Sequence, residues 1–392
     1  MRQSYPSNYR EYAYVSNTGS NTVSVIDVLA FKKLKEIPVG AQPTGIAINP
    51  HKNEVYVVNA ASNSVSVINA VRNQVIATIP VGKTPYFIDV TADGKRGLVA
   101  NSGDNSISII DLYAHTITAT IRVGKAPGIV RAAEHAALAV VSERIGNSIS
   151  VLDLNTLKLR TSSLPVCAQP TDLVVMPDGS KAFIACSGSN QIAVVALGSR
   201  EVDDSVVQTS IKKFTAHNPN SKGVAEGIPD GWRWTVQDKL LTLLTVGKSP
   251  VQLALKPDTG ELFATNFDAE TVSEVLTGDN EVGGTYYIGS HPDAALVSDD
   301  NSLLYVANFG SNNVTAYSVD NGKVAATVAV GSRPDALALS ANQNFLLVAD
   351  SGSNDVAIVR TRVIKGTSPT LFTLIPVGAQ PNAIAIKSFI SK

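Results

Sequence analysis

The chain has little of what marks the membrane, metal-binding and disulfide-rich classes of protein. Its 392 residues include two cysteines, which are too few for a disulfide framework and lack the spacing of a metal site. No apolar run approaches the roughly 18 residues of a membrane-spanning helix, and the first residues lack the apolar stretch of a secretory signal. The sequence as given predicts a cytoplasmic protein, or a periplasmic or extracellular one if a signal has been removed.

Several nucleotide-binding and metalloenzyme motifs are also absent. The sequence contains no P-loop, no dinucleotide-binding fingerprint and no HExxH motif. Thirty-two basic and 33 acidic residues give a formal charge of −1, with no long run of like charge and no basic stripe. Because polyanions require a basic surface, nucleic acid is not an expected partner.

The chain has instead one phrase that recurs eight times. IPVGAQPTGIAI starts at Ile37 and IPVGAQPNAIAI starts at Ile375, with six relatives between them. The steps between their prolines are 42, 42, 43, 80, 42, 42 and 47 residues, so the step of 80 holds one period and about 38 inserted residues. The eight prolines are Pro43, Pro85, Pro127, Pro170, Pro250, Pro292, Pro334 and Pro381.

Each period contains four short segments rich in Val and Ile, separated by clusters of Asn, Ser, Gly and Asp. A four-stranded unit that recurs every 40 to 45 residues is typical of a β-propeller. Dividing the chain without its insertion by the period gives about eight blades, with seven as the alternative. The sequence therefore predicts an all-β fold of four-stranded antiparallel blades.

The two ends of the chain carry complementary pieces of one blade. The first strand-like segment, at Tyr12, matches the second strand of a period, whereas the last segment, Asn382 to Ile386, is a surplus first strand. A ring gains from this arrangement because the last strand covers an exposed sheet edge and joins the two ends. We expect the C-terminal strand to complete the N-terminal blade.

The strand ends YVSN, YVVN and YVAN, followed by VSVID and then VGxxP, resemble the YVTN β-propeller repeat family. The resemblance covers nearly the whole chain outside residues 199 to 238, and it implies a propeller without implying one activity. Related propellers include lactonase-like enzymes, virginiamycin B lyase and the eight-bladed haem d1-binding domain of cytochrome cd1. A haem site requires axial histidines, and His291 with Arg333 does not establish one.

One insertion interrupts a single propeller domain that spans residues 1 to 392. Residues 199 to 238 follow the third strand of blade five and precede its fourth strand. The insertion contains both tryptophans, Trp232 and Trp234. Exposed aromatic side chains favour a protein contact or a subunit interface, and packing of the insertion onto its own blade is the alternative.

The strongest candidate site lies where the repeat is broken. The VGxxP loops and the loops between second and third strands share one face of the ring, here named the top face, around the mouth of the central channel. Two neighbouring blades carry SHPD and SRPD there, which places His291, Asp293, Arg333 and Asp335 in one sector. His291, Asp293 and Asp335 could hold a divalent metal ion, or His291 and Arg333 could act in catalysis. In the structural alternative, each Asp caps a turn and pairs with Arg in solvent.

A second group of departures lies on blades four and five. Glu143 and Cys186 replace the Asn that ends most second strands, and Cys167 replaces a loop Gly. Glu143 is a further candidate catalytic residue. The two cysteines are expected to be small buried side chains, and a disulfide or a reactive thiol is the alternative.

The first strands supply further polar candidates. Tyr86, Asp172 and Gln252 are predicted ligand-binding residues at the channel mouth, together with Asp293 and Asp335. Asp89 and Arg131 are the only charged residues in their column of the repeat, so we expect them to form a buried, structural ion pair between adjacent blades.

These features favour two functions. The first is a scaffold that binds a small ligand or a protein partner at the top-face channel mouth. The alternative is a metal-dependent enzyme of the lyase or lactonase kind, with its site near His291.

Overall fold

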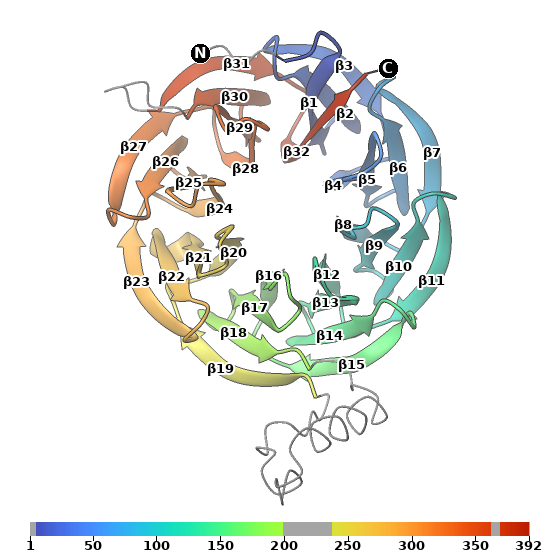
Figure 1. The fold of residues 1–392 in the computed structure, drawn as a ribbon, viewed down its shortest axis with the longest axis vertical. Helices are drawn as coiled ribbons and strands as arrows, with labels where there is room; N and C mark the ends of the chain where they lie inside the picture. The colour runs from blue at the N-terminus through green and yellow to red at the C-terminus, as the bar shows by residue number, and fades with distance from the viewer. Residues whose placement is uncertain (1–4, 199–236, 362–368, 392) are drawn as a thin grey trace, which may run out of the picture.

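The computed structural model describes residues 5–198, 237–361 and 369–391. Within them, 32 strands form eight four-stranded antiparallel sheets, which are arranged as blades around a ring (Figure 1). The predicted all-β propeller with eight blades is confirmed. Blade one contains β1, β2, β3 and β32, and each of the seven others contains four consecutive strands, from β4–β7 in blade two to β28–β31 in blade eight.

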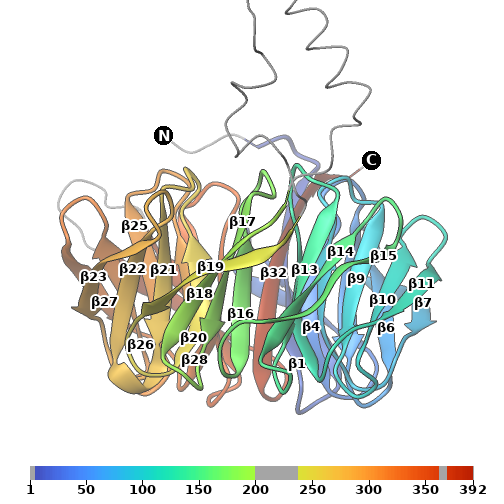
Figure 2. The ribbon, with the colours of Figure 1, turned by 90° about the horizontal axis from the view of Figure 1, so that it is seen from below.

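The innermost strands begin at the eight prolines of the repeat, since Pro has no N–H and is tolerated at the first residue of a strand. They are β4 (Pro43–Ile48), β8 (Pro85–Val90), β12 (Pro127–Ala132), β16 (Pro170–Val175), β20 (Pro250–Leu255), β24 (Pro292–Val297), β28 (Pro334–Leu339) and β32 (Pro381–Ile390). Seen from the side, inner strands such as β16 and β32 run along the axis of the ring, whereas outer strands such as β15 and β19 run obliquely (Figure 2).

The second and third strands form the core of each blade, because both faces of each sheet pack against neighbouring blades. The second strands are β1 (Tyr9–Asn17), β5 (Glu54–Asn59), β9 (Arg96–Asn101), β13 (Leu138–Glu143), β17 (Lys181–Cys186), β21 (Glu261–Asn266), β25 (Leu303–Asn308) and β29 (Phe345–Asp350). The third strands are β2 (Thr22–Asp27), β6 (Ser64–Asn69), β10 (Ser106–Asp111), β14 (Ser148–Asp153), β18 (Gln191–Ala196), β22 (Thr271–Leu276), β26 (Asn313–Ser318) and β30 (Asp355–Arg360). Every residue of β5, EVYVVN, is buried, as expected of a strand covered on both faces.

The fourth strands form the rim of the ring and alternate between exposed and covered residues, as in β7 and β23. They are β3 (Lys32–Pro38), β7 (Gln74–Pro80), β11 (Thr116–Arg122), β15 (Lys158–Pro165), β19 (Lys239–Thr245), β23 (Glu281–Tyr287), β27 (Lys323–Ala329) and β31 (Thr370–Pro376). The one helical turn of the described residues is η2 (Phe267–Ala269), on the top face of blade six.

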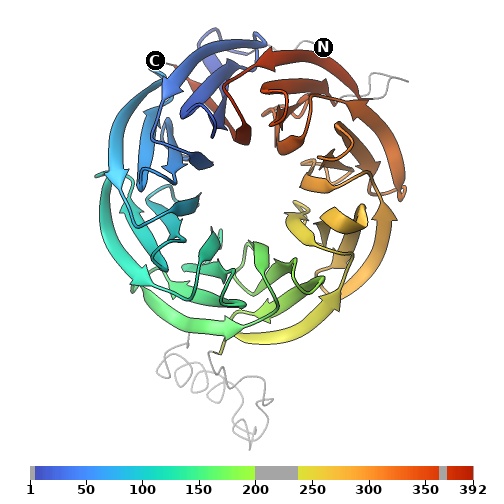
Figure 3. The ribbon, with the colours of Figure 1, turned by 180° about the vertical axis from the view of Figure 1, so that it is seen from behind.

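The ring closes as predicted, with a longer strand pair than the sequence suggested. β32 pairs with β1 from Tyr9 opposite Ile390 to Asn17 opposite Pro381. Viewed from the opposite face, the red C-terminal strand lies inside the blue N-terminal strands (Figure 3). Backbone hydrogen bonds between the two ends of the chain therefore complete blade one.

A side-chain hydrogen bond recurs at seven of the eight crossings between blades. The residue before each inner-strand proline has a positive φ, between 46° and 56°, and so takes a left-handed conformation that is uncommon outside glycine. At seven crossings its N–H donates to the side-chain oxygen of an Asn in the preceding top-face loop, at 2.8–3.0 Å. We call this contact the Asn latch; its acceptors are Asn21, Asn63, Asn105, Asn147, Asn190, Asn312 and Asn354.

None of the described helical residues forms a helix long and apolar enough to cross a bilayer. This finding agrees with the absence of long apolar runs in the sequence.

Candidate functional site

A cavity of about 350 Å³ lies in the central channel. Its charged lining residues are Arg131 and Asp335, and its polar ones include Tyr86 and Gln252. Thr44 and Asn382 are also polar, and the other lining residues are small or apolar. The lining residues come from β4, β8, β12, β20, β24, β28 and β32, so seven of the eight blades contribute to the wall. A smaller cavity of about 240 Å³ shares Ile46, Phe87 and Arg131 with it.

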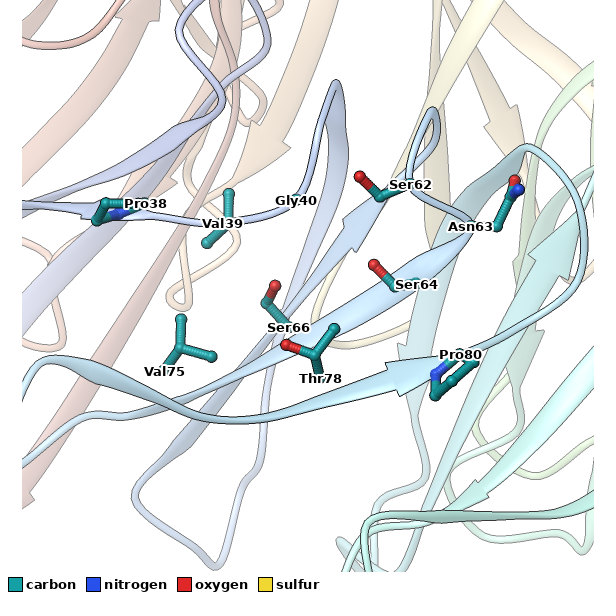
Figure 4. Close-up of a pocket in the computed structure, with 10 residues that line it drawn as sticks. All are labelled: Pro38, Val39, Gly40, Ser62, Asn63, Ser64, Ser66, Val75, Thr78 and Pro80. Carbon is teal, nitrogen blue, oxygen red and sulfur yellow. The ribbon is translucent and has the colours of Figure 1, made fainter.

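A larger hollow, of about 500 Å³, lies away from the channel between blades one and two (Figure 4). Its lining combines hydroxyl groups with apolar side chains and contains no charged residue: Pro38, Val39, Gly40, Ser62, Asn63, Ser64, Ser66, Val75, Thr78 and Pro80. We regard the channel cavity as the better candidate site because it holds ionisable groups, which bind and react with polar ligands.

Asp293 and Asp335 form a carboxyl pair at the start of neighbouring inner strands. The two side chains are largely buried and share a hydrogen bond. Burial, followed by the hydrogen bond and the charge of Asp293, raises the pKa of Asp335 to about 8. Burial also raises the pKa of Asp293 above its ordinary value. A pKa of about 8 means that Asp335 is largely protonated at neutral pH, so the pair holds at least one proton.

The predicted metal ligands do not converge. The Nδ1 atom of His291 lies 2.9 Å from Ser290 Oγ, and its ring packs edge-to-face on Phe267 with the centroids 4.7 Å apart. In the described part of the chain, no three His, Cys, Asp or Glu side chains are grouped so that they could hold a metal ion. The geometry therefore gives no support to a metal site made of His291, Asp293 and Asp335.

Arg333 lies on the top face and makes no ion pair with either Asp in the described residues. Its guanidinium carbon lies 5.7 Å from the centroid of the Phe309 ring. The backbone N–H of Arg333 donates to the side chain of Asn312, as one of the Asn latches. The structural alternative for SHPD and SRPD, in which each Asp pairs with Arg in solvent, is therefore not observed either. Arg333 remains an exposed cation near the channel mouth.

Asp89 and Arg131 contact each other as expected, but their environment differs from the prediction. Arg131 Nη1 lies 3.6 Å from Asp89 Oδ1, and 39% of the Arg131 side chain is exposed. The guanidinium also stacks over the Phe87 ring, 4.5 Å from its centroid. The pair was expected to be buried between blades. Instead, Arg131 faces the channel and lines both cavities.

Two predicted ligand-binding residues, Asp172 and Gln252, make hydrogen bonds between adjacent blades. Asp172 Oδ2 accepts the N–H of Leu253 in the next blade at 2.9 Å, and Gln252 Oε1 accepts the N–H of Ala295 in the blade after that. Asp89 acts in the same way, with Oδ2 2.8 Å from the N–H of Ala132. Inner strands leave backbone donors unpaired at the channel edge, and these side chains satisfy them. Asp172 is only 7% exposed, so we reassign it from ligand binding to structure.

Glu143 is also structural. Its side chain is fully buried, accepts the N–H of Gly124 at 2.7 Å, and accepts short hydrogen bonds from Ser148 and Ser150. Asn59 stands in the same place in blade two and bonds to Ser64 and Ser66. Glu143 is therefore a variant of a repeated core contact, with no access to a substrate.

Cys167 and Cys186 form a disulfide, with their Cα atoms 5.8 Å apart. Both are buried, as predicted, but the expectation that they are unpaired is wrong. The alternative of a disulfide, which follows from the closeness of the loop to the paired strand end, is the correct one.

Sequence reasoning missed Arg144, Glu270 and Ser290. Arg144 follows Glu143 on the top face, and its guanidinium stacks over the Tyr86 ring at 4.4 Å. Glu270 occupies the position of the latch Asn in blade six and accepts a hydrogen bond from Ser290 Oγ at 2.9 Å. Alignment of the eight latch positions would have found Glu270, because it is the only one that is not Asn.

The predicted insertion at residues 199 to 238 lies outside the described residues as far as residue 236, and Trp232 and Trp234 lie with it. The strands on either side, β18 and β19, are the third and fourth strands of blade five.

Comparison with known proteins supports the fold. A family model described as YNCE-like beta-propeller matches residues 3–138, and a model of the lactonase, 7-bladed beta-propeller, matches residues 287–381. No curated protein matches the sequence. The lactonase model has seven blades whereas this chain has eight, so the match covers shared repeats and not a shared number of blades.

Among solved structures, dihydro-heme d1 dehydrogenase NirN in complex with DHE is 13% identical and has a TM-score of 0.70, with 98% of this chain and 76% of that chain covered. Periplasmic gluconolactonase PpgL from Pseudomonas aeruginosa is 15% identical, with a TM-score of 0.62 and 98% and 99% covered. Apo AztD from Citrobacter koseri is 14% identical, with a TM-score of 0.64 and 97% and 98% covered. The chain is an eight-bladed β-propeller that resembles YNCE-like propellers near its N-terminus and lactonase propellers near its C-terminus.

Proposed function

We propose that the protein binds a small polar ligand in the channel cavity, with the Asp293–Asp335 pair as the main hydrogen-bonding group. The observation that carries this proposal is the contrast between this pair and the other channel acids. The carboxylates of Asp89 and Asp172 accept hydrogen bonds from backbone N–H groups of adjacent blades. In the described residues, the side chains of Asp293 and Asp335 hydrogen-bond only to each other.

The chemistry of the pair indicates the kind of ligand. A protonated carboxyl donates a hydrogen bond and a carboxylate accepts one, so the pair suits hydroxyl or amino groups. The cavity of about 350 Å³ lies within the range of small-molecule sites. Arg131 and Tyr86 supply a cation and an aromatic face on the wall formed by blades three and four, opposite blades seven and eight (Figure 1).

Binding of polyols, amino sugars, sugar acids and lactones would test the proposal, with calorimetry on each compound that raises the melting temperature. We expect Asp335→Asn and Asp293→Asn to weaken binding about tenfold, because each replaces one carboxyl group by an amide and the two side chains can no longer share a proton. Asp320→Asn, at an exposed turn, is the matched control. A ligand that binds wild type and both pair variants equally would place its site elsewhere.

Acid–base catalysis on a lactone is the second candidate. Two carboxyl groups that share a proton can act as general acid and general base. The lactonase family model spans residues 287–381 and so includes both groups, and PpgL is a gluconolactonase. Hydrolysis of D-glucono-1,5-lactone that is lost in Asp335→Asn and unaffected by a chelator would support this candidate without a metal. Loss of hydrolysis in the presence of the chelator would instead indicate that the activity requires the predicted divalent metal ion.

We also propose that the protein folds in an oxidising compartment. A buried structural disulfide such as Cys167–Cys186 is typical of exported proteins and rare in the cytosol. Thiol labelling of the protein in its native host, before lysis exposes it to air, would test this. Labelling of both cysteines without reduction would contradict it.

A further inference from the structure

The crossing from blade six to blade seven lacks the contact that all other crossings share. At the seven others, an Asn side chain accepts the N–H of the residue before the inner-strand proline. At this crossing Glu270 stands in place of the Asn, and the residue before the proline is His291. The top-face loop is rebuilt at the same point, as the turn η2. Three changes at one crossing therefore need a common explanation.

Glu270, Ser290 and His291 form a chain of hydrogen bonds. Ser290 Oγ donates to Glu270 Oε1 at 2.9 Å and lies 2.9 Å from His291 Nδ1. The single hydroxyl proton goes to the carboxylate, because a carboxylate only accepts. Ser290 Oγ must then accept from the imidazole, so the proton of neutral His291 lies on Nδ1. The lone pair of His291 lies on Nε2.

The surroundings hold the imidazole in place and leave Nε2 free. The ring packs edge-to-face on Phe267, and the backbone of His291 is held at φ 50°. His291 is partly exposed on the top face, and no described residue makes a hydrogen bond to Nε2. The hydrogen bond from Ser249 lowers the pKa of the nearby Asp268, and the charges of Lys248 and His291 lower it further.

We propose that His291 is a general base at the channel mouth and that Ser290 and Glu270 are its positioning residues. Nε2 accepts the proton of an O–H group, from a bound hydroxyl compound or from water. The O–H bond breaks and leaves its electron pair on the oxygen, which becomes the nucleophile. An N–H bond forms, and the resulting imidazolium is stabilised by Glu270 through Ser290. This role does not depend on the Asp293–Asp335 pair, and it differs from metal ligation because it requires a fixed proton on Nδ1.

The tautomer can be measured without knowing the substrate. Long-range ¹H–¹⁵N spectra distinguish an imidazole protonated on Nδ1 from one protonated on Nε2, and His291→Gln assigns the signal. We expect the Nδ1–H form in wild type and a shift toward Nε2–H in Ser290→Ala and Glu270→Ala. His51, whose Nε2 lies 3.0 Å from the carbonyl of Ala92, is the internal control and should not change. A His291 already protonated on Nε2, or unaffected by Ser290→Ala, would overturn the proposal.

Chemical reactivity gives a second readout of the same atom. Diethyl pyrocarbonate acylates imidazole nitrogen through its lone pair, and mass spectrometry locates the product. We expect His291 to react about threefold faster in wild type than in Ser290→Ala or Glu270→Ala at the same pH. The rate at His51 should be equal in all three proteins. Equal rates at His291 would show that Ser290 and Glu270 contribute only to folding, and thermal unfolding of each variant confirms that the comparison is made on folded protein.

Discussion

Blades two and five differ in the contact between the end of the second strand and the neighbouring loop. In blade two, Gly40 packs against Asn59 so closely that a Cβ on the glycine would lie 2.6 Å from Asn59 Cγ. The Asn then donates to Ser64 and Ser66. In blade five, Cys167 and Cys186 occupy the two positions and form a disulfide, and Gln191 and Ala193 replace the two hydroxyl residues.

The comparison shows that one structural position can be stabilised by different chemistry. Asn occupies the strand-end position in five blades, while Glu143, Cys186 and Asp350 occupy it in the other three. Each of the three resembles a functional residue when read in isolation. Each instead contacts the same neighbouring loop, through Gly124, Cys167 or Gly331. A departure from a repeat therefore does not by itself indicate function, because the new side chain can stabilise the same position by different chemistry.

Among the changes at this contact, removal of the disulfide should lower the free energy of unfolding most. Its two cysteines are 19 residues apart, and a loop of that length corresponds to about 3 kcal/mol of stability. We expect Cys167→Ala with Cys186→Ala to lower the free energy of unfolding by about that amount in urea. Reducing agent should lower the stability of wild type equally and leave the double variant unchanged. Insensitivity of wild type to reductant would contradict the assignment.

Glu143→Ala should cost about 2 kcal/mol, because it leaves the N–H of Gly124 and two buried hydroxyl groups without an acceptor. Glu143→Asn restores the residue of the regular blades and should cost less. Urea unfolding of the two variants measures the difference. Channel binding should be unchanged in both, and a loss of binding in folded Glu143→Asn would restore Glu143 as a site residue.

Asp350→Asn should stabilise the protein in a pH-dependent way. Burial, followed by the hydrogen bond and charge of Asp355, raises the pKa of Asp350 to about 8. A carboxyl whose pKa rises on folding favours the folded state only while it stays protonated, so the stability of wild type falls as pH rises from about 4 to about 8. We expect no effect of Asp350→Asn on thermal unfolding near pH 4 and a gain of about 1–2 kcal/mol at pH 8. A gain that is the same at both pH values would show that the charge is not its cause.

Glu270→Asn should have the smallest effect on stability. It restores the residue that forms the Asn latch at the seven other crossings, so we expect thermal stability within about 0.5 kcal/mol of wild type. The same variant should lose the Nδ1–H form of His291, because Ser290 loses its carboxylate acceptor. A large destabilisation would mean that Glu270 supports the fold in a way that the hydrogen bonds do not show.

The sequence predicted the fold more fully than the site. The period of 42, the alternation of short apolar segments and the split blade at the two ends were sufficient for eight blades and for ring closure through β32. Because these features recur along the chain, a segment that is ambiguous in one blade can be assigned by comparison with the same segment of the other blades. The site residues lie at single departures from the repeat, where no second copy indicates the partner.

Particular residues show why the site was harder to predict. Asp172 and Gln252 are polar residues on channel-lining strands, and nothing in the sequence indicates that their side chains accept backbone N–H groups of the next blade. His291 and Asp293 are two residues apart, yet His291 bonds to Ser290 and Asp293 bonds to Asp335 of the next blade. Closeness in sequence therefore suggested a common metal site that the geometry does not form.

By itself, the sequence determined an eight-bladed ring, the position of its channel and the closure of its ends, because strand length and period depend on local patterns of apolar and turn residues. The tertiary structure alone decided which polar side chains remain free. Hydrogen-bond partners of Asp89, Asp172 and Asp335 come from other blades, more than 40 residues away in the chain. A buried polar group must be paired, and only the packed ring shows which polar side chains already have a partner in another blade. In the described residues, the Asp293–Asp335 pair and the Nε2 atom of His291 accept no backbone N–H from another blade, which is why both proposals rest on them.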